Sequence, residues 1–189
     1  MINSWRPLAM SRAWRRTIQF HTDSRGSFGE LWRARWLDDL RSDGQAEPRM
    51  RQANLSRSHP GVLRGLHMHM RQADLWVVLE GHPFVALVDV RPLLAGAGGP
   101  KAETVDAGPG DAFYLPERVA HGFYARDAIT LVYLVTNEYD GSDELGFAWD
   151  DSAAAVDWPT KQPILSARDQ ANPSLDDLVA SIRQQRSDR

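Results

Sequence analysis

Short runs of apolar residues, bounded by glycine, proline or polar residues, dominate the chain from residue 75 onward. Four runs are rich in β-branched or aromatic side chains: residues 75–79, 84–90, 112–115 and 129–135. Runs of this length and composition are typical of β-strands. Turn residues recur about every 8–15 positions, a spacing that favours an all-β barrel or sandwich.

Weaker signals of the same kind precede residue 60. Residues 17–21 predict a short strand, and the turn-forming residues 23–26 follow it. Between residues 28 and 36, apolar and charged positions alternate, which predicts a strand with one buried face. The apolar positions of that strand are Phe28, Trp32, Ala34 and Trp36. Loops or irregular segments are expected at residues 40–51, 94–100 and 149–163.

One segment has the periodicity of a helix. From Ser174 to about Gln185 the apolar residues form one stripe, and Ser174 with Asp177 resembles a capping box. We expect residues 1–16 to form a loose arm and residues 186–189 to be frayed. A length of 189 residues suits a single domain with a substantial core.

Composition narrows the classes of function. A net charge of −3 gives no reason to expect a nucleic-acid partner, and the absence of cysteine excludes disulfides and thiolate chemistry. Residues 1–16 lack the apolar core of a secretion signal, and no apolar run approaches the ~20 residues of a membrane helix. We therefore expect a cytoplasmic protein that binds neither nucleic acid nor membranes.

Histidines occur in two ordered groups. His67, His69 and Asp74 lie between two glycines, and His121 follows a glycine and a proline further along. In a strand, the spacing of His67 and His69 places both imidazoles on one face. The two groups resemble the two half-motifs of the cupins, in which three histidines and one acid converge inside a small β-barrel.

These residues alone leave three roles open for His67 and His69: metal ligand, catalytic base or packed interior histidine. A base that removes a carbon-bound proton needs a neutral imidazole held in one tautomer, which a carboxylate can provide. Asp169 lies at the head of a loop that could close over the barrel and could supply that carboxylate.

Two further sets of side chains have both an ordinary and a functional interpretation. Tyr133, in a strand-like run, is either a core aromatic or a phenol that donates a proton inside the barrel. Arg25, Arg57 and Arg64 either form surface salt bridges or clamp a diphosphate through bidentate contacts.

Several short blocks follow one another in a fixed order over residues 23–173. They are Asp23-x-Arg25-Gly26-x-Phe28-x-Glu30, Gln52-x-Asn54-x-Ser56-x-Ser58, Arg64-Gly65-Leu66-His67, Pro116 with Ala120-His121-Gly122-Phe123, Tyr133, Tyr139, Glu144-x-Gly146-Phe147-x-Trp149 and Leu165-Ser166-x-x-Asp169. In this order the blocks resemble the dTDP-4-dehydrorhamnose 3,5-epimerases, a cupin family that epimerises 4-keto sugars linked to a nucleotide.

The resemblance implies a fold and a mechanism. It implies a mainly β cupin (double-stranded β-helix) barrel with a short C-terminal helix. It also implies that His67, oriented by Asp169, removes the proton beside the 4-keto group, and that Tyr133 returns a proton on the opposite face. No cofactor is implied, because the ketone of the substrate accepts the electron pair.

The resemblance also implies a homodimer, in which the early strand carrying Arg25, Phe28 and Glu30 reaches the partner's nucleotide site. The other substrate-binding residues that it implies are Gln52, Ser58, Arg64, His121, Tyr139 and Glu144.

Two positions depart from the family pattern: His69 replaces the usual Gln, and Asp74 replaces a Lys near the ketone oxygen. Stabilisation of an oxyanion is worth roughly 3–4 kcal/mol, and an ionised carboxylate would oppose a developing enolate. A third difference is the residue after Tyr133, which is Leu134 where Lys is common. The chain therefore resembles a divergent member, acting on another sugar nucleotide or inverting a single carbon.

The departures also create an alternative. His67, His69, Asp74 and His121 form a mixed nitrogen and oxygen set that suits a divalent transition metal. We favour the metal-free epimerase, because one histidine cannot be both a tight ligand and a free base. A third alternative is a sugar-nucleotide-binding protein without turnover.

Overall fold

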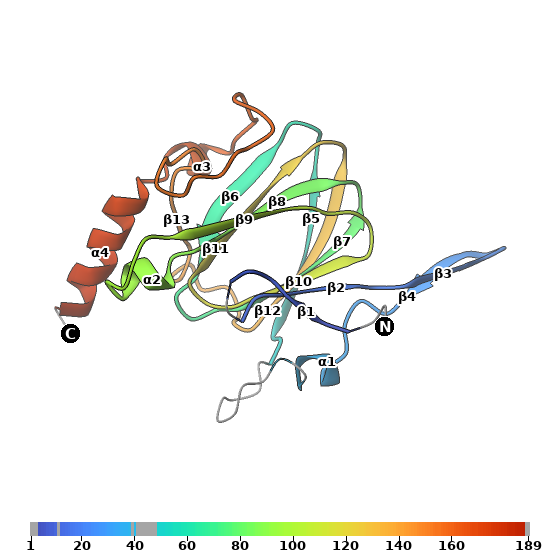
Figure 1. The fold of residues 1–189 in the computed structure, drawn as a ribbon. Coiled ribbons are helices and arrows are strands. Elements are labelled where there is room, and N and C mark those ends of the chain that lie inside the picture. Colours follow the sequence, from blue (N-terminus) through green and yellow to red (C-terminus); the bar gives the residue numbers. More distant parts are fainter. Residues whose placement is uncertain (1–3, 11, 39, 41–48, 188–189) are drawn as a thin grey trace.

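Two β-sheets face each other in the computed structural model, which describes residues 4–187 except 11, 39 and 41–48 (Figure 1). In spatial order, the six-stranded sheet contains β1 (Arg6–Pro7), β2 (Trp14–Thr17), β10 (Asp111–Leu115), β7 (Asp74–Glu80), β12 (Ile129–Val135) and β5 (Gln52–Ser58). The five-stranded sheet contains β13 (Leu145–Gly146), β6 (Leu63–Met68), β11 (Val119–Ala125), β8 (Pro83–Asp89) and β9 (Lys101–Asp106).

The remaining elements lie around this barrel. β3 (Phe20–Asp23) and β4 (Gly26–Gly29) form a separate hairpin that extends away from the sheets (Figure 1). The helices are α1 (Arg35–Asp38), α2 (Arg91–Leu94), α3 (Ala167–Gln170) and α4 (Leu175–Ser187). The architecture is mainly β with a short C-terminal helix, which confirms the predicted fold class. None of the described helices is long and apolar enough to cross a membrane.

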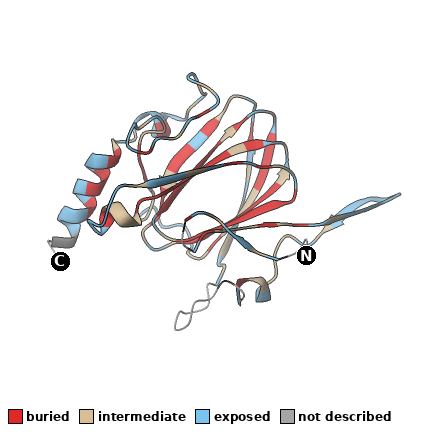
Figure 2. Ribbon diagram, viewed as in Figure 1, coloured by how far each residue is buried: buried red, intermediate tan, exposed pale blue. Residues whose placement is uncertain are grey.

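The five-stranded sheet is buried on both faces, as β8 shows. Val85 and Leu87 belong to the apolar cluster between the sheets, whereas Ala86 and Val88 belong to a second cluster on the outer face. This alternation follows from the two-residue repeat of a strand. Figure 2 shows the same contrast between the buried barrel strands and the exposed hairpin.

Helix α4 covers that outer face with the predicted stripe. Leu175, Leu178 and Ile182 are buried in the second cluster. At the start of the helix, the backbone N–H of Asp177 donates to Oγ of Ser174 over 3.1 Å, as the capping box predicts. The C-terminal helix was therefore correctly predicted from its periodicity and its cap.

The four predicted strands at 75–79, 84–90, 112–115 and 129–135 correspond to β7, β8, β10 and β12. The predicted strand at residues 28–36 is wrong, because β4 ends at Gly29 and α1 begins at Arg35. Phe28 is 69% exposed, since the hairpin has no neighbouring sheet against which an apolar face could pack. Most of the predicted loop at 40–51 lies outside the described residues.

The N-terminal segment is also more ordered than predicted, because β2 pairs with β10 in the six-stranded sheet. Its arginines are held by specific contacts. Arg15 makes a two-pronged hydrogen-bonded contact with Asp111, at 2.8 and 3.1 Å. The guanidinium of Arg16 lies 3.6 Å from the ring centre of Trp36 and 5.2 Å from that of Trp5. Stacking on aromatic rings lets a basic segment pack, which charge alone did not suggest.

Candidate active site

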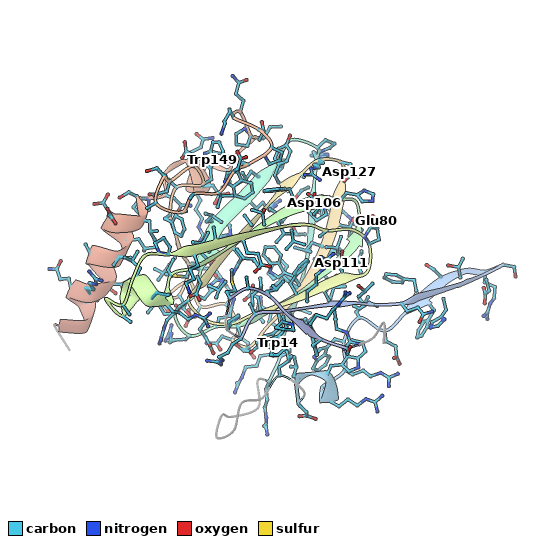
Figure 3. All side chains as sticks on the ribbon, viewed as in Figure 1. Trp14, Glu80, Asp106, Asp111, Asp127 and Trp149 are labelled. Carbon is cyan, nitrogen blue, oxygen red and sulfur yellow. The ribbon has the colours of Figure 1, made fainter. Side chains whose placement is uncertain are left out.

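A cavity of about 400 Å³ lies in the barrel, and side chains of both sheets fill the space around it (Figure 3). That volume is in the range of small-molecule sites. Its lining mixes polar, charged and aromatic side chains. They are Gln52, Asn54, Ser56, Arg64, His67, His69, Gln72, Asp74, Trp76, His121, Phe123, Leu131, Tyr133, Val135, Tyr139, Glu144 and Arg168.

His67 forms a hydrogen-bonded pair with Asp169, which lies behind it. Nε2 of His67 is 2.6 Å from Oδ1 of Asp169. Because an ionised carboxylate can only accept, Nε2 donates and Nδ1 keeps its lone pair. A quarter of the His67 side chain is exposed to the cavity, whereas only 4% of the Asp169 side chain is exposed. The imidazole is thus fixed in one tautomer and accessible.

Asp169 is itself held by the start of helix α3. Ser166 precedes the helix, and its hydroxyl donates to Oδ2 of Asp169 over 2.9 Å while Oγ accepts from the Asp169 N–H. Burial raises the pKa of Asp169, but hydrogen bonds from His67 and Ser166 and the charges of His67 and Arg168 lower it by more. The net pKa lies below the usual value, so Asp169 is a carboxylate.

A close contact of two strands brings His67 next to His121. The two residues are paired across β6 and β11. Gly65, at φ +124°, leaves no room for a side chain: a Cβ there would lie 2.6 Å from Cα of Gly122 and 2.8 Å from O of His121. Glycine at this point permits the close approach of the backbones. The Arg64-Gly65-Leu66-His67 block therefore has a structural reason for its glycine.

Tyr133 reaches the cavity from the opposite sheet. It lies in β12 of the six-stranded sheet, whereas His67 lies in β6 of the five-stranded sheet. Burial raises the pKa of the Tyr133 phenol, as do the charges of Asp74 and Glu144, while Arg64 lowers it by less. The phenol therefore keeps its proton near neutral pH and is able to donate it.

His69, Asp74 and His121 form a separate buried group, with ligand atoms within 4.8 Å of one another. His67 is not part of this group among the described residues, so the structure brings together three of the four proposed metal ligands. Burial, followed by the charges of His69 and His67, lowers the pKa of His121 well below its usual value. Burial is also the largest cause of the raised pKa of Asp74.

Other predicted residues lie at the rim of the cavity. Gln52 accepts a hydrogen bond from the backbone N–H of Tyr139 over 2.9 Å, and the Tyr139 side chain is exposed. Glu144 accepts from Nη1 of Arg168 over 2.9 Å. The first contact joins the strand β5 to the segment that follows β12, and the second joins that segment to α3.

Arg64 and Ser58 act together at the same rim. Nε of Arg64 donates to Oγ of Ser58 over 2.9 Å. Ser58 is buried and does not line the cavity, so it positions Arg64. Arg57 is exposed and contributes its backbone oxygen to Arg64 at 3.4 Å.

The residues of the hairpin are not brought to this cavity. Asp23 binds the exposed Arg25 at 2.6 Å, while Phe28 and Glu30 border a second hollow beside Trp36. Within one chain, these three predicted substrate residues therefore stand apart from His67.

Sequence reasoning missed two prominent cavity residues, Trp76 and Arg168. Trp76 lies two positions after Asp74 in β7, so strand alternation could have placed it on the same face. Its Nε1 donates to Oδ2 of Asp74 over 3.3 Å. Arg168 precedes Asp169 in a four-residue helix that sequence analysis did not predict.

Comparisons with known proteins show that the chain is similar to one family of sugar-nucleotide epimerases. A model of the dTDP-4-dehydrorhamnose 3,5-epimerases matches residues 7–177. A Mycobacterium tuberculosis protein of that name is 37% identical over 185 residues, covering 93% of this chain and 89% of the relative. A Streptomyces niveus dTDP-4-dehydrorhamnose 3-epimerase is 36% identical over 170 residues, covering 87% of this chain and 80% of the relative.

A solved structure agrees with this relationship. The epimerase of Legionella pneumophila, in complex with dTDP-4-keto-L-rhamnose, superposes with a TM-score of 0.80 at 29% identity, covering 95% of this chain and 96% of the other. The family match extends over both sheets and over the His67–Asp169 pair. This chain therefore belongs to the dTDP-4-dehydrorhamnose 3,5-epimerase family.

Proposed function

We propose that this protein inverts C3, C5 or both carbons of a dTDP-linked 4-keto-6-deoxy sugar, in the synthesis of deoxysugars for polysaccharides or glycosylated metabolites. The observation that carries the proposal is the pair of His67 and Asp169, 2.6 Å apart, in contact with the cavity that Tyr133 lines. Relatives named as 3,5-epimerase and as 3-epimerase support the class of substrate.

The proposed reaction is a proton exchange through an enolate. The 4-keto group acidifies the neighbouring C–H, and Nδ1 of His67 takes that proton while the electron pair moves to the ketone oxygen. Tyr133 then donates its proton to the same carbon from the other wall, and the ketone reforms. The phenolate regains a proton from solvent and the imidazolium loses one. No redox or organic cofactor takes part, because the ketone accepts and returns the electron pair.

Two guanidinium groups at the rim suit the diphosphate of a nucleotide sugar. Arg64 is anchored by Ser58 and Arg168 by Glu144, so each is oriented before a ligand arrives. Arginine suits phosphate because its donors match pairs of phosphate oxygens. The exposed ring of Tyr139 offers an apolar surface for the nucleotide base.

Exchange with solvent tests the proposal. In D2O, a dTDP-linked 4-keto-6-deoxy sugar should gain deuterium at C3, at C5 or at both, as followed by proton NMR. We expect exchange in chelator-treated protein as well, because the groups that transfer the proton belong to the chain. Binding of the sugar nucleotide without any exchange would contradict the epimerase and support the binding-only alternative.

We further propose that the protein forms a homodimer through the β3–β4 hairpin. The hairpin leaves the barrel (Figure 1), and its Phe28 side chain is 69% exposed. A large exposed aromatic residue on a projecting arm is suited to a partner surface. A two-fold dimer would let Arg25, Phe28 and Glu30 complete the partner's substrate site.

Sedimentation velocity at micromolar concentration should show a dimer of the 21.2 kDa chain. We expect Phe28→Ser to shift the equilibrium toward monomer, since it removes apolar area from the interface. Leu55→Ser, at another exposed apolar position, is the matched control and should leave the dimer intact. A monomeric wild-type protein would contradict the proposal.

A further inference from the structure

Beside the His67–Asp169 pair lies a buried group that the proposed proton transfers do not use. His69, Asp74 and His121 are each at most 6% exposed, and their ligand atoms lie within 4.8 Å of one another. Asp74 begins β7 in one sheet, His121 lies in β11 of the other, and His69 directly follows β6. The fold thus brings three metal-binding side chains together from both walls of the cavity.

Both histidines are oriented by the backbone. Nδ1 of His69 lies 2.7 Å from the carbonyl oxygen of Asp143, and Nδ1 of His121 lies 3.1 Å from that of Val119. A carbonyl only accepts, so each Nδ1 carries the proton and each Nε2 carries a lone pair. Metal-binding histidines are typically held by such a hydrogen bond through their second nitrogen.

The carboxylate of Asp74 is oriented as well. Its Oδ1 accepts from Nε2 of Gln72 over 2.9 Å, and its Oδ2 accepts from Nε1 of Trp76 over 3.3 Å. Each oxygen has a second lone pair for another partner. The hydrogen bonds fix the carboxylate without using up its capacity to bind.

The three groups do not satisfy one another by hydrogen bonding. Nε2 of His121 lies 3.7 Å from Oδ2 of Asp74, beyond hydrogen-bond distance. Metal bonds of about 2.0–2.2 Å in tetrahedral geometry would place neighbouring ligand atoms roughly 3.3–3.6 Å apart, close to the separation of this pair. An ion can reach the group from solvent, because all three residues line the cavity.

We propose that His69, Asp74 and His121 bind one divalent transition-metal ion, with open coordination positions toward the cavity. Two imidazoles and one carboxylate suit Zn²⁺, Mn²⁺, Fe²⁺, Co²⁺ or Ni²⁺. His67 is not included, since among the described residues the group whose ligand atoms lie within 4.8 Å of one another contains only His69, Asp74 and His121. Of the three histidines that line the cavity, two would thus bind the ion and the third would serve as the base.

A consequence for catalysis rests on the proposed function. Asp74 lines the cavity that would hold the keto sugar, and an ionised carboxylate alone would oppose the developing enolate. A bound cation would reverse that local charge and favour the developing oxyanion. The bound ion would therefore place a positive charge where Asp74 alone contributes a negative one.

Metal titration tests the site directly. Tag-free protein is stripped with EDTA, dialysed, and titrated with Zn²⁺ and with Mn²⁺ in a calorimeter, with elemental analysis of the loaded protein. We expect one ion per chain. His69→Gln and Asp74→Asn should each weaken binding by about 100-fold or more, since even residues that only orient a ligand contribute about 10–100-fold.

Two variants serve as controls. His82→Gln changes an exposed histidine that is paired with Asp127, a residue labelled in Figure 3, and should bind like the wild type. His67→Ala should also keep its ion. Absence of binding in the wild type would overturn the proposal, and so would unchanged binding by the His69→Gln and Asp74→Asn variants.

Circular dichroism identifies any variant that fails to fold. In that case zinc-edge X-ray absorption of the loaded wild-type protein decides, with two imidazole nitrogens expected at about 2.0–2.1 Å. A spectrum without imidazole ligands would overturn the site.

Deuterium exchange separates this inference from the proposed function. Loading the ion should raise the exchange rate by on the order of 100-fold, the usual worth of one oxyanion-stabilising group. Equal rates with and without the ion would overturn its electrostatic role and leave the epimerase standing. A bound ion with no exchange in either form would overturn the epimerase and leave the metal site standing.

Discussion

His67→Ala is expected to lower deuterium exchange into the substrate by about 10²–10⁴-fold, the usual contribution of a general base. His67 is accessible in the cavity and hydrogen-bonded to a carboxylate. The other two histidines of the cavity are buried, and their nearest carboxylate oxygens lie 3.7 and 3.8 Å away. Neither is therefore placed to replace the lost base. Proton NMR in D2O measures the rate.

Two further variants show whether the loss of exchange in His67→Ala is specific to the proposed base. His82→Ala, at an exposed position, should exchange like the wild type. Tyr133→Phe should retain part of the exchange but slow net inversion, since the enolate still forms and is reprotonated from its original face. Exchange at the wild-type rate in the His67→Ala protein would remove His67 from the mechanism.

The second large effect is expected for Asp169→Asn, which should lower kcat by about 100-fold or more with little change in KM. In the proposed mechanism, the carboxylate keeps the proton on Nε2 of His67, from which it lies 2.6 Å away, and stabilises the imidazolium that forms. An amide can donate its own N–H to Nε2, which selects the wrong tautomer. Loss of the equivalent charge in a serine protease costs about 10⁴-fold.

The separation of kcat from KM distinguishes this role from a merely structural one. Asp176→Asn makes the same chemical change at an exposed position of α4 and should leave both constants unchanged. If Asp169→Asn raised KM and spared kcat, Asp169 would bind substrate instead of orienting the base.

The strands and the helix that the pattern of apolar and polar residues correctly predicted pack against another layer of the fold. The strand Ile129–Val135 was predicted to the residue, because a β-branched run bounded by polar residues matches a central strand. The strand expected at residues 28–36 was wrong. Alternation indicates a buried face only where another layer exists to cover it, and the hairpin has none within the chain.

Part of the site was predicted because short sequence blocks follow one another in the same order as in the family that the chain resembles. The pairing of His67 with Asp169 spans 102 positions, and resemblance, not spacing, pointed to it. The sequence did not predict that His67 would pair with Asp169 while His69 and His121 join Asp74 in a separate group. Whether His67 joins His69 in one group depends on ring orientation, which β6 and the backbone carbonyls decide.

The placement of His67 and Tyr133 on facing walls bears on the products. In the proposed mechanism, the base His67 and the acid Tyr133 act on one carbon at a time, from opposite faces of the ring. Inverting a second carbon requires the pyranose to turn over or to shift within the cavity between the two steps. Trp76 and Phe123 line the cavity, and we therefore expect the room that they leave for the sugar to govern whether one epimer or two are formed.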